Sequence, residues 1–124
     1  MIFRNFGLLL LSLAVLVTGC PGSSSKEESF NIKIQDRAVT DDMALIRVYQ
    51  GDMVTLWWTT DEVATIHLHG YDIQQVVKPG VPTVFTFKAD ASGRYPITAH
   101  GFGETALGKA QEETALVYLE VLPR

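Results

Sequence analysis

The sequence predicts an all-β fold, an antiparallel sandwich or barrel of seven to eight short strands. The first observation behind this prediction is that apolar side chains recur at every second position in short runs after residue 30, and no stretch there keeps a convincing helical period. The second is that turn sequences separate these runs, among them Gln50-Gly51-Asp52, Lys78-Pro79-Gly80 and Ala91-Ser92-Gly93. Such a series of short strands within about 95 residues is typical of a sandwich or barrel.

Each expected strand follows from the alternation within its run. In the first run, Phe30, Ile32 and Ile34 alternate with polar residues, so that one face of the strand is apolar. The neighbouring Trp57 and Trp58 must lie on opposite faces of one strand, which places one of them in the core. The predicted strands are Phe30–Gln35, Leu45–Tyr49, Met53–Thr59, Ala64–His69, Ile73–Val77, Thr83–Lys88, Arg94–His100 and Ala115–Leu122.

Length and composition exclude several classes of function. The chain has 124 residues, which is room for one domain. It carries 10 Lys plus Arg against 14 Asp plus Glu, so we expect no basic surface for a nucleic-acid partner. Its single cysteine excludes an intramolecular disulfide, a cysteine-rich zinc site and an iron–sulfur cluster. Motifs of serine hydrolases, phosphate-binding loops and redox cysteine pairs are missing as well.

The first twenty residues have the pattern of an export signal. Arg4 precedes a largely apolar run from Phe6 to Val17, which is shorter than the roughly 20 residues that a membrane-spanning helix needs. A positive start, a short apolar centre and small residues at the exit are typical of a secretory signal peptide. Val17-Thr18-Gly19-Cys20 resembles the lipobox of bacterial lipoproteins, which implies a signal peptide over residues 1–19 and a lipid on Cys20. A membrane anchor helix or a buried free thiol is the alternative.

The segment after the lipobox is small, polar and charged. Residues 20–29 are therefore expected to be a flexible tether between the lipid and a folded domain over residues 30–124. This organisation predicts a protein of the bacterial cell envelope, held at the membrane by its lipid and facing the periplasm or the outside. Pro21 follows Cys20 in place of the aspartate that resembles an inner-membrane retention signal, which favours the outer membrane.

All three histidines lie between positions 67 and 100, which favours a shared metal site. His67 and His69 are two residues apart on a predicted strand, so their side chains project from the same face with Cα atoms about 6.6–6.8 Å apart. Both imidazoles can then reach one metal ion at about 2.0–2.1 Å. If Ile66 and Leu68 face the core, the two histidines are accessible. His100 ends another predicted strand and can complete the site.

Three neutral imidazoles with an open position suit copper or zinc, and copper is favoured on affinity. Glu104 could add a ligand or hold an imidazole, and Asp72 could orient a histidine. Met43 and Met53 offer soft thioethers that suit Cu(I), although Met53 is expected to pack in the fold. In the alternative interpretation the histidines are ordinary polar residues of a solvated strand face, Glu104 is a solvated loop charge, and Asp72 caps a turn.

The ordered set of motifs resembles the cupredoxin family over about residues 30–122. Val48–Leu56 resembles the strand–turn–strand signature of that family, Lys78–Lys88 resembles its following hairpin, and Ala91–Tyr95 resembles the entry to its ligand-bearing strand. The run His67–Asp72, HLHGYD, resembles bacterial single-domain cupredoxin-like proteins grouped with the domain of periplasmic iron-uptake lipoproteins. The resemblance implies a Greek-key β-sandwich.

The chain departs from the blue-copper pattern of that family. Blue-copper proteins place a cysteine and a second histidine after the ligand strand begins, whereas Gly93–His100 contains no cysteine and Cys20 lies in the lipobox. Because a blue-copper site requires a thiolate, no such centre and no electron transfer through one are expected.

The leading hypothesis is a lipid-anchored copper-binding protein that uses His67, His69 and His100 to store, buffer or deliver copper, with a copper-handling or electron-transport protein as partner. The alternative is a metal-free accessory or interaction module at the membrane. An enzyme is not expected, because no evident general base accompanies the histidines, although an open three-histidine site can activate water or oxygen.

Overall fold

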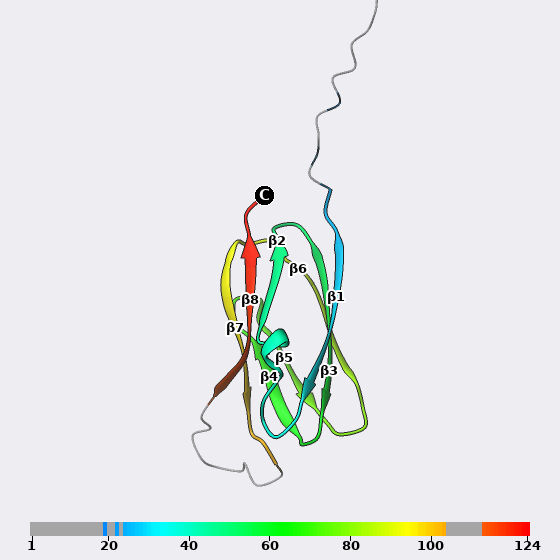
Figure 1. Ribbon diagram of the computed structural model, residues 1–124, viewed down its shortest axis with the longest axis vertical. Helices are drawn as coiled ribbons and strands as arrows, with labels where there is room; N and C mark the ends of the chain where they lie inside the picture. Colours follow the sequence, from blue (N-terminus) through cyan, green and yellow to red (C-terminus); the bar gives the residue numbers. More distant parts are fainter. Residues whose placement is uncertain (1–18, 20–21, 23, 104–112) are drawn as a thin grey trace, which may run out of the picture.

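The computed structural model describes residues 19, 22, 24–103 and 113–124, which form a sandwich of two β-sheets (Figure 1). The predicted all-β class and all eight predicted strands are confirmed. The strand order is β1-β3-β6 in the smaller sheet and β2-β8-β7-β4-β5 in the larger one. The strands are β1 (Glu27–Ile34), β2 (Leu45–Tyr49), β3 (Met53–Thr60), β4 (Ala64–Leu68), β5 (Ile73–Val77), β6 (Thr83–Lys88), β7 (Gly93–His100) and β8 (Thr114–Leu122), with the short 3₁₀ helix η1 (Asp41–Met43) before β2.

Two of the strand pairs are parallel, which corrects the expectation of a purely antiparallel sandwich. Strand β1 pairs with β3 in parallel, and β2 pairs with β8 in parallel, while the other pairs are antiparallel. A parallel pair needs a long connection between its strands. The chain supplies one here because it crosses to the other sheet between β1 and β3, and because β2 and β8 are separated by most of the domain.

The domain begins closer to the N-terminus than the expected boundary at residue 30. Strand β1 starts at Glu27, inside the segment predicted as tether. The backbone N–H of Lys26 donates to Oδ1 of Asp52 over 2.9 Å, and the N–H of Met53 donates to the carbonyl of Lys26 over 2.8 Å. These bonds fix the start of β1 beside the start of β3. Cys20, the predicted lipidation site, lies outside the described residues.

The core lies between the two sheets and decides which way the functional side chains point. In β4, Ala64, Ile66 and Leu68 are fully buried, and each large apolar side chain so buried stabilises the fold by about 1.5–3 kcal/mol. The alternate residue His67 therefore projects from the outer face, as predicted. Trp58 is likewise buried against Phe85, whereas Trp57 on the opposite face is 43% exposed.

The start of β1 and the end of β8 lie at one end of the sandwich, and β7 ends at the other (Figure 1). The guanidinium of Arg124 donates to the carbonyls of Ser24 and Gln50 over 2.7 and 3.0 Å, which joins the segment before β1 to the end of the folded domain. Gly93, at the start of β7, pairs with Val121 near that end, so His100 lies roughly 20–25 Å further along the strand.

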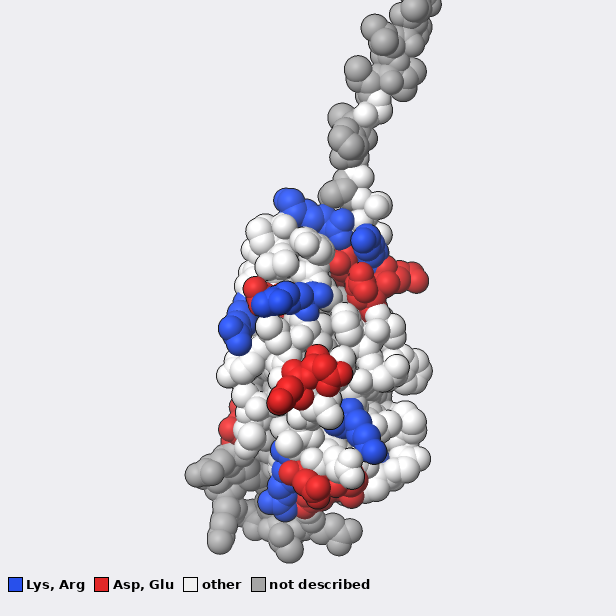
Figure 2. Space-filling model, in the orientation of Figure 1, with Lys and Arg blue, Asp and Glu red and all other residues white. Residues whose placement is uncertain are grey.

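The outer surface carries charges of both signs. Figure 2 shows Lys and Arg side chains interspersed with Asp and Glu on one face of the molecule, including the end where the chain leaves β1. Within the described part of the chain, no helix has the length and apolar character needed to cross a bilayer.

Candidate metal centre

The three histidines lie together on the outer face of the five-stranded sheet. In the antiparallel pair β4–β7, His67 is opposite Thr98 and His100 is opposite Thr65, so the two imidazoles are diagonal neighbours on one face. Strand β4 ends at Leu68, one residue earlier than predicted, so His69 lies just beyond it. The backbone N–H of His69 still donates to the carbonyl of Pro96 over 3.2 Å. Pairing of adjacent strands thus gathers the three predicted ligands.

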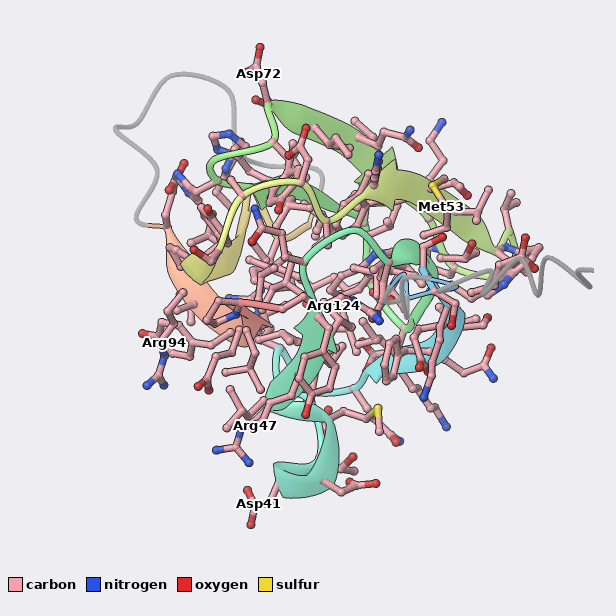
Figure 3. All side chains as sticks on the ribbon, turned by 90° about the horizontal axis from the view of Figure 1, so that it is seen from above. Asp41, Arg47, Met53, Asp72, Arg94 and Arg124 are labelled. Carbon is pink, nitrogen blue, oxygen red and sulfur yellow. The ribbon has the colours of Figure 1, made fainter. Side chains whose placement is uncertain are left out.

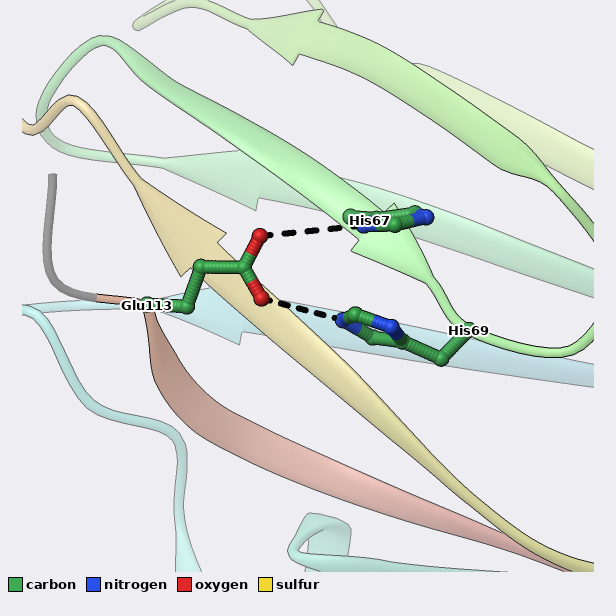
Figure 4. Close-up of side chains that lie close together, drawn as sticks. All are labelled: His67, His69 and Glu113. Carbon is green, nitrogen blue, oxygen red and sulfur yellow. Dashed lines mark hydrogen bonds and ion pairs between the residues drawn. The ribbon is translucent and has the colours of Figure 1, made fainter. Parts of the chain in front are cut away.

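A carboxylate that sequence analysis did not single out lies among the three rings. Glu113 immediately precedes β8, which pairs with β7 on the side away from β4. Its Oε2 atom is 3.1 Å from Nε2 of His69, and its Oε1 atom is 3.8 Å from Nδ1 of His67 and 3.6 Å from Nδ1 of His100. Figure 4 shows the carboxylate of Glu113 facing the rings of His67 and His69 from the other side of β7.

Thr98 holds this carboxylate in place. The Thr98 hydroxyl donates to Oε2 of Glu113 over 3.2 Å and lies 3.0 Å from Nε2 of His69. The side chain of Thr98 is buried, and the rings of His67 and His69 lie against each other with centroids 3.9 Å apart and planes tilted by 37°. The imidazoles and the carboxylate are therefore positioned by contacts with one another and with the sheet.

The surroundings of Glu113 keep it ionised. Partial burial raises the pKa of this carboxyl group, but the hydrogen bond from Thr98 and the nearby rings of His69 and His67 lower it more. The net result is a pKa below the usual value for glutamate. At neutral pH the cluster therefore offers an anionic oxygen ligand beside the imidazole nitrogens.

The geometry fits a single bound ion. The ligand atoms of His67, His69 and Glu113 all lie within 4.8 Å of one another. Two atoms that are each about 2.0–2.1 Å from the same ion lie roughly 3–4 Å apart, and the three distances from Glu113 fall in that range. His100 stands just outside this compact group, beside the same carboxylate oxygen.

The buried Nδ1 atom of His100 supports the same interpretation. Among the described residues it has no hydrogen-bond partner, since Oε1 of Glu113 is too distant at 3.6 Å. A buried polar atom without a partner costs about 1–3 kcal/mol. A metal ion between His100 and Glu113 would remove that cost, and imidazole nitrogens with a carboxylate oxygen are suitable ligands for copper or zinc.

The other predicted site residues do not join this cluster. Asp72 is exposed in the turn between β4 and β5 with a φ of 55°, and Figure 3 shows it at the periphery of the molecule. In the part of the chain that the structure describes, no hydrogen bond or ion pair joins Asp72 to a histidine. Its place in the turn agrees with the alternative interpretation, in which Asp72 is a turn residue. Glu104 lies outside the described residues.

The two methionines weighed as soft ligands also lie elsewhere. Met43 belongs to η1, before the edge strand β2. Met53 begins β3 in the other sheet, where it is 39% exposed, so the expectation that it packs in the fold is wrong. Figure 3 shows its side chain at the outside of the sandwich.

The signal for Glu113 was present in the sequence but indirect. The predicted strands Arg94–His100 and Ala115–Leu122 are consecutive in the chain, and consecutive strands are commonly neighbours in a sheet. Antiparallel pairing of these two strands brings the residues just before Ala115 beside the end of the strand that carries His100. Spacing from His100 alone points to Glu104 instead.

Comparisons with known proteins place the fold. Neither a protein-family model nor a curated protein sequence matches the chain. The crystal structure of the Blue Copper Oxidase from Nitrosomonas europaea is similar, with 21% identity and a TM-score of 0.58 over 81% of this chain and 40% of that one. The chain thus spans less than half of that oxidase's length.

Two further solved structures have the same architecture. One is the NMR structure of a copper binding protein in the apo form, with 9% identity and a TM-score of 0.54 over 81% of this chain and 99% of that one. The other is the mixed disulfide intermediate between thioredoxin-like TlpAs and subunit II of cytochrome c oxidase, with 12% identity and a TM-score of 0.54 over 77% of this chain and 81% of that one. At these identities the likeness establishes the fold, which is a cupredoxin-like β-sandwich.

Proposed function

We propose that this protein is a copper-binding protein of the bacterial cell envelope that holds the ion with His67, His69, His100 and Glu113. The observation that carries this proposal is the meeting of three imidazoles on one ionised carboxylate at the outer face of the large sheet. The proposed ligand set therefore differs from the histidine-only site expected from the sequence, because Glu113 adds an anionic oxygen.

Copper is preferred to zinc in this proposal for two reasons. Copper(II) binds nitrogen and oxygen ligands more tightly than zinc in the Irving–Williams order. In addition, two structures that share the fold are described as a blue copper oxidase and a copper binding protein. The ligand strand β7 lacks a cysteine, so the proposed centre is not of the blue-copper type.

The accessibility of the site favours storage, buffering or delivery over a permanently enclosed centre. The side chains of His67, His69, His100 and Glu113 are between 19 and 39% exposed, so an ion can enter and leave from solvent. We further propose that a lipid on Cys20 anchors the chain in the envelope, with the outer membrane favoured. The tether would then leave the sandwich at the end opposite His100, which leaves the site free for a copper-handling or electron-transport partner.

A metal titration tests the proposal. The purified protein, stripped with a chelator, should bind one Cu(II) per chain and show nitrogen hyperfine splitting in its electron paramagnetic resonance spectrum. Ala in place of His67, His69 or His100 should weaken binding by more than the roughly 10–100-fold that loss of a residue orienting a ligand costs, and zinc should bind less tightly than Cu(II). Glu120→Gln is a matched control for Glu113→Gln, because Glu120 is also an outward carboxylate of this sheet but pairs with Arg47 over 3.3 Å.

Failure to bind stoichiometric metal would overturn this proposal. In that case the metal-free interaction module would be the better interpretation, and Ala in place of His67 or His69 should leave both folding and partner binding unchanged.

A further inference from the structure

The ligand atoms of the proposed site are all nitrogen or oxygen. His67 and His100 present Nδ1, His69 presents Nε2, and Glu113 presents two carboxylate oxygens. Soft sulfur ligands select Cu(I), whereas nitrogen and oxygen ligands in tetragonal arrangements are typical of Cu(II). The chemistry of the ligand set therefore bears on the oxidation state of the bound ion.

The described sulfur atoms are remote from this ligand set. Met53 alternates with the buried Val54 and points outward from the small sheet, whereas the histidines point outward from the large one, on the other side of the sandwich. Met43 precedes β2, and two strands separate β2 from β4, a distance of roughly 14 Å across the sheet. Neither thioether can therefore coordinate the same ion as His67.

The charge of the cluster also distinguishes the two oxidation states. Glu113 is anionic, and the hydrogen bond from Thr98 holds its Oε2 atom beside Nε2 of His69. The Coulomb attraction between this carboxylate and a cation is twice as large for a divalent ion as for a monovalent ion at the same distance. Nδ1 of His100 is itself buried, but the side chains of all four ligands are partly exposed, so water can reach the further positions that a tetragonal Cu(II) ion requires.

From these observations we infer that the site selects Cu(II) over Cu(I). The inference rests on the proposed function, because it presumes that the cluster binds copper, and it specifies the form in which copper is held. The carboxylate of Glu113 confers the preference for Cu(II), and the imidazoles contribute affinity for either oxidation state.

Paired affinity measurements test this inference. Cu(II) affinity is measured in air against an amino-acid chelator, and Cu(I) affinity is measured under anaerobic conditions with ascorbate against a bathocuproine chelator. The ratio of Cu(II) affinity to Cu(I) affinity should be more than about tenfold larger for the purified protein than for free imidazole. Equal affinities, or a preference for Cu(I), would overturn the inference and leave the proposed function standing. If neither ion binds, both are wrong.

Variants of Glu113 isolate its contribution. Glu113→Gln removes the charge but keeps the shape, and it should reduce Cu(II) affinity by about 10–100-fold while changing Cu(I) affinity little. Glu113→Met replaces the oxygen with a thioether and should shift the preference toward Cu(I). Glu120→Gln should leave the ratio of the two affinities unchanged. An equal loss of Cu(I) and Cu(II) affinity in Glu113→Gln would show that the carboxylate does not discriminate, and thermal unfolding of each apo variant separates such a loss from misfolding.

Discussion

The hydroxyl of Thr98 donates a hydrogen bond of 3.2 Å to the carboxylate of Glu113 and thereby links the middle of β7 to the residue that precedes β8. The same hydroxyl lies 3.0 Å from Nε2 of His69. A buried neutral side chain therefore fixes the distance between the anionic ligand and an imidazole ligand. Thr98 is not proposed to bind the ion itself, and its role is to position the ligands.

Replacement of Thr98 by Val tests this role, because Val has nearly the same shape but no hydroxyl. The pKa of Glu113 should rise toward its usual value, since the hydrogen bond from Thr98 lowers it. Copper affinity should fall by about tenfold, as is typical when a group that orients a metal ligand is lost. Calorimetric copper titration measures the change. The control is Thr55→Val, because Thr55 faces Thr86 at 3.4 Å on the small sheet, and an equal loss there would contradict a positioning role.

Copper binding should depend on pH in two stages. Imidazole binds a metal only when its ligand nitrogen is unprotonated, so protons compete with the ion and copper affinity should fall as the solution is acidified. Glu113, with its lowered pKa, should stay ionised below the ordinary glutamate value of about 4.3. Glu113→Gln should therefore reduce affinity near neutral pH but leave the midpoint of the fall unchanged. A midpoint near the glutamate range would contradict histidine ligation.

The strands and the outward direction of the histidines could be predicted because both depend on local pattern. Alternation within β4 is fixed by Ile66 and Leu68, and once these two residues enter the core His67 must face outward. Turns between strands have their own sequence signals, as Lys78-Pro79-Gly80 illustrates. None of this requires knowledge of which strands become neighbours.

Strand direction and the identity of the carboxylate ligand could not be predicted in the same way. The alternation of Phe30, Ile32 and Ile34 is compatible with parallel or antiparallel pairing, so it did not reveal that β1 runs parallel to β3. The position of Glu113 depends on the register of β8 against β7, which shifts between Ile97 and Thr98. Such a register shift is a property of two strands together, and neither strand's sequence shows it alone.

Gly70 controls the turn that carries His69. Its φ of 85° favours glycine, and a Cβ atom there would lie 2.6 Å from Cε1 of Tyr95, whose ring packs against the core. Gly70→Ala should destabilise the fold by about 1–3 kcal/mol and also weaken copper binding, because the displaced turn moves His69. Gly80→Ala is the matched control, since Gly80 has a φ of 76° but no atom within 4 Å of the added Cβ.

Denaturant unfolding and copper titration of both glycine variants separate the two effects. Backbone strain alone should lower the stability of each variant by a similar amount, whereas the collision with Tyr95 is confined to Gly70→Ala. Unchanged copper affinity in a folded Gly70→Ala protein would show that the turn does not position His69.

At the end of the sandwich away from His100, the buried Asp52 holds the start and the end of the domain together. Its carboxylate accepts hydrogen bonds from the backbone N–H groups of Lys26 and Tyr49, each 2.9 Å long, and from the guanidinium of Arg124. Asp52→Ala should reduce the free energy of unfolding by about 3 kcal/mol, because the buried end of Arg124 loses its charged partner, although the carbonyls of Ser24 and Gln50 still bind it, and two backbone donors lose theirs. Glu120→Ala removes the exposed pair with Arg47 and should cost about 0–1 kcal/mol.

The contribution of Asp52 should also disappear in acid. Burial raises the pKa of Asp52, but the hydrogen bonds from Lys26 and Tyr49 and the charge of Arg124 lower it more, so its folded-state pKa lies below the usual value. A lowered carboxyl pKa stabilises the folded protein above the unfolded-state pKa of about 3.9, and this stability is lost as the pH falls through the folded-state pKa. Urea unfolding of wild type and Asp52→Ala between about pH 7 and pH 2 should therefore give curves that converge in acid. A constant difference across that range would mean that packing, and not the ionised carboxylate, accounts for the effect of the substitution.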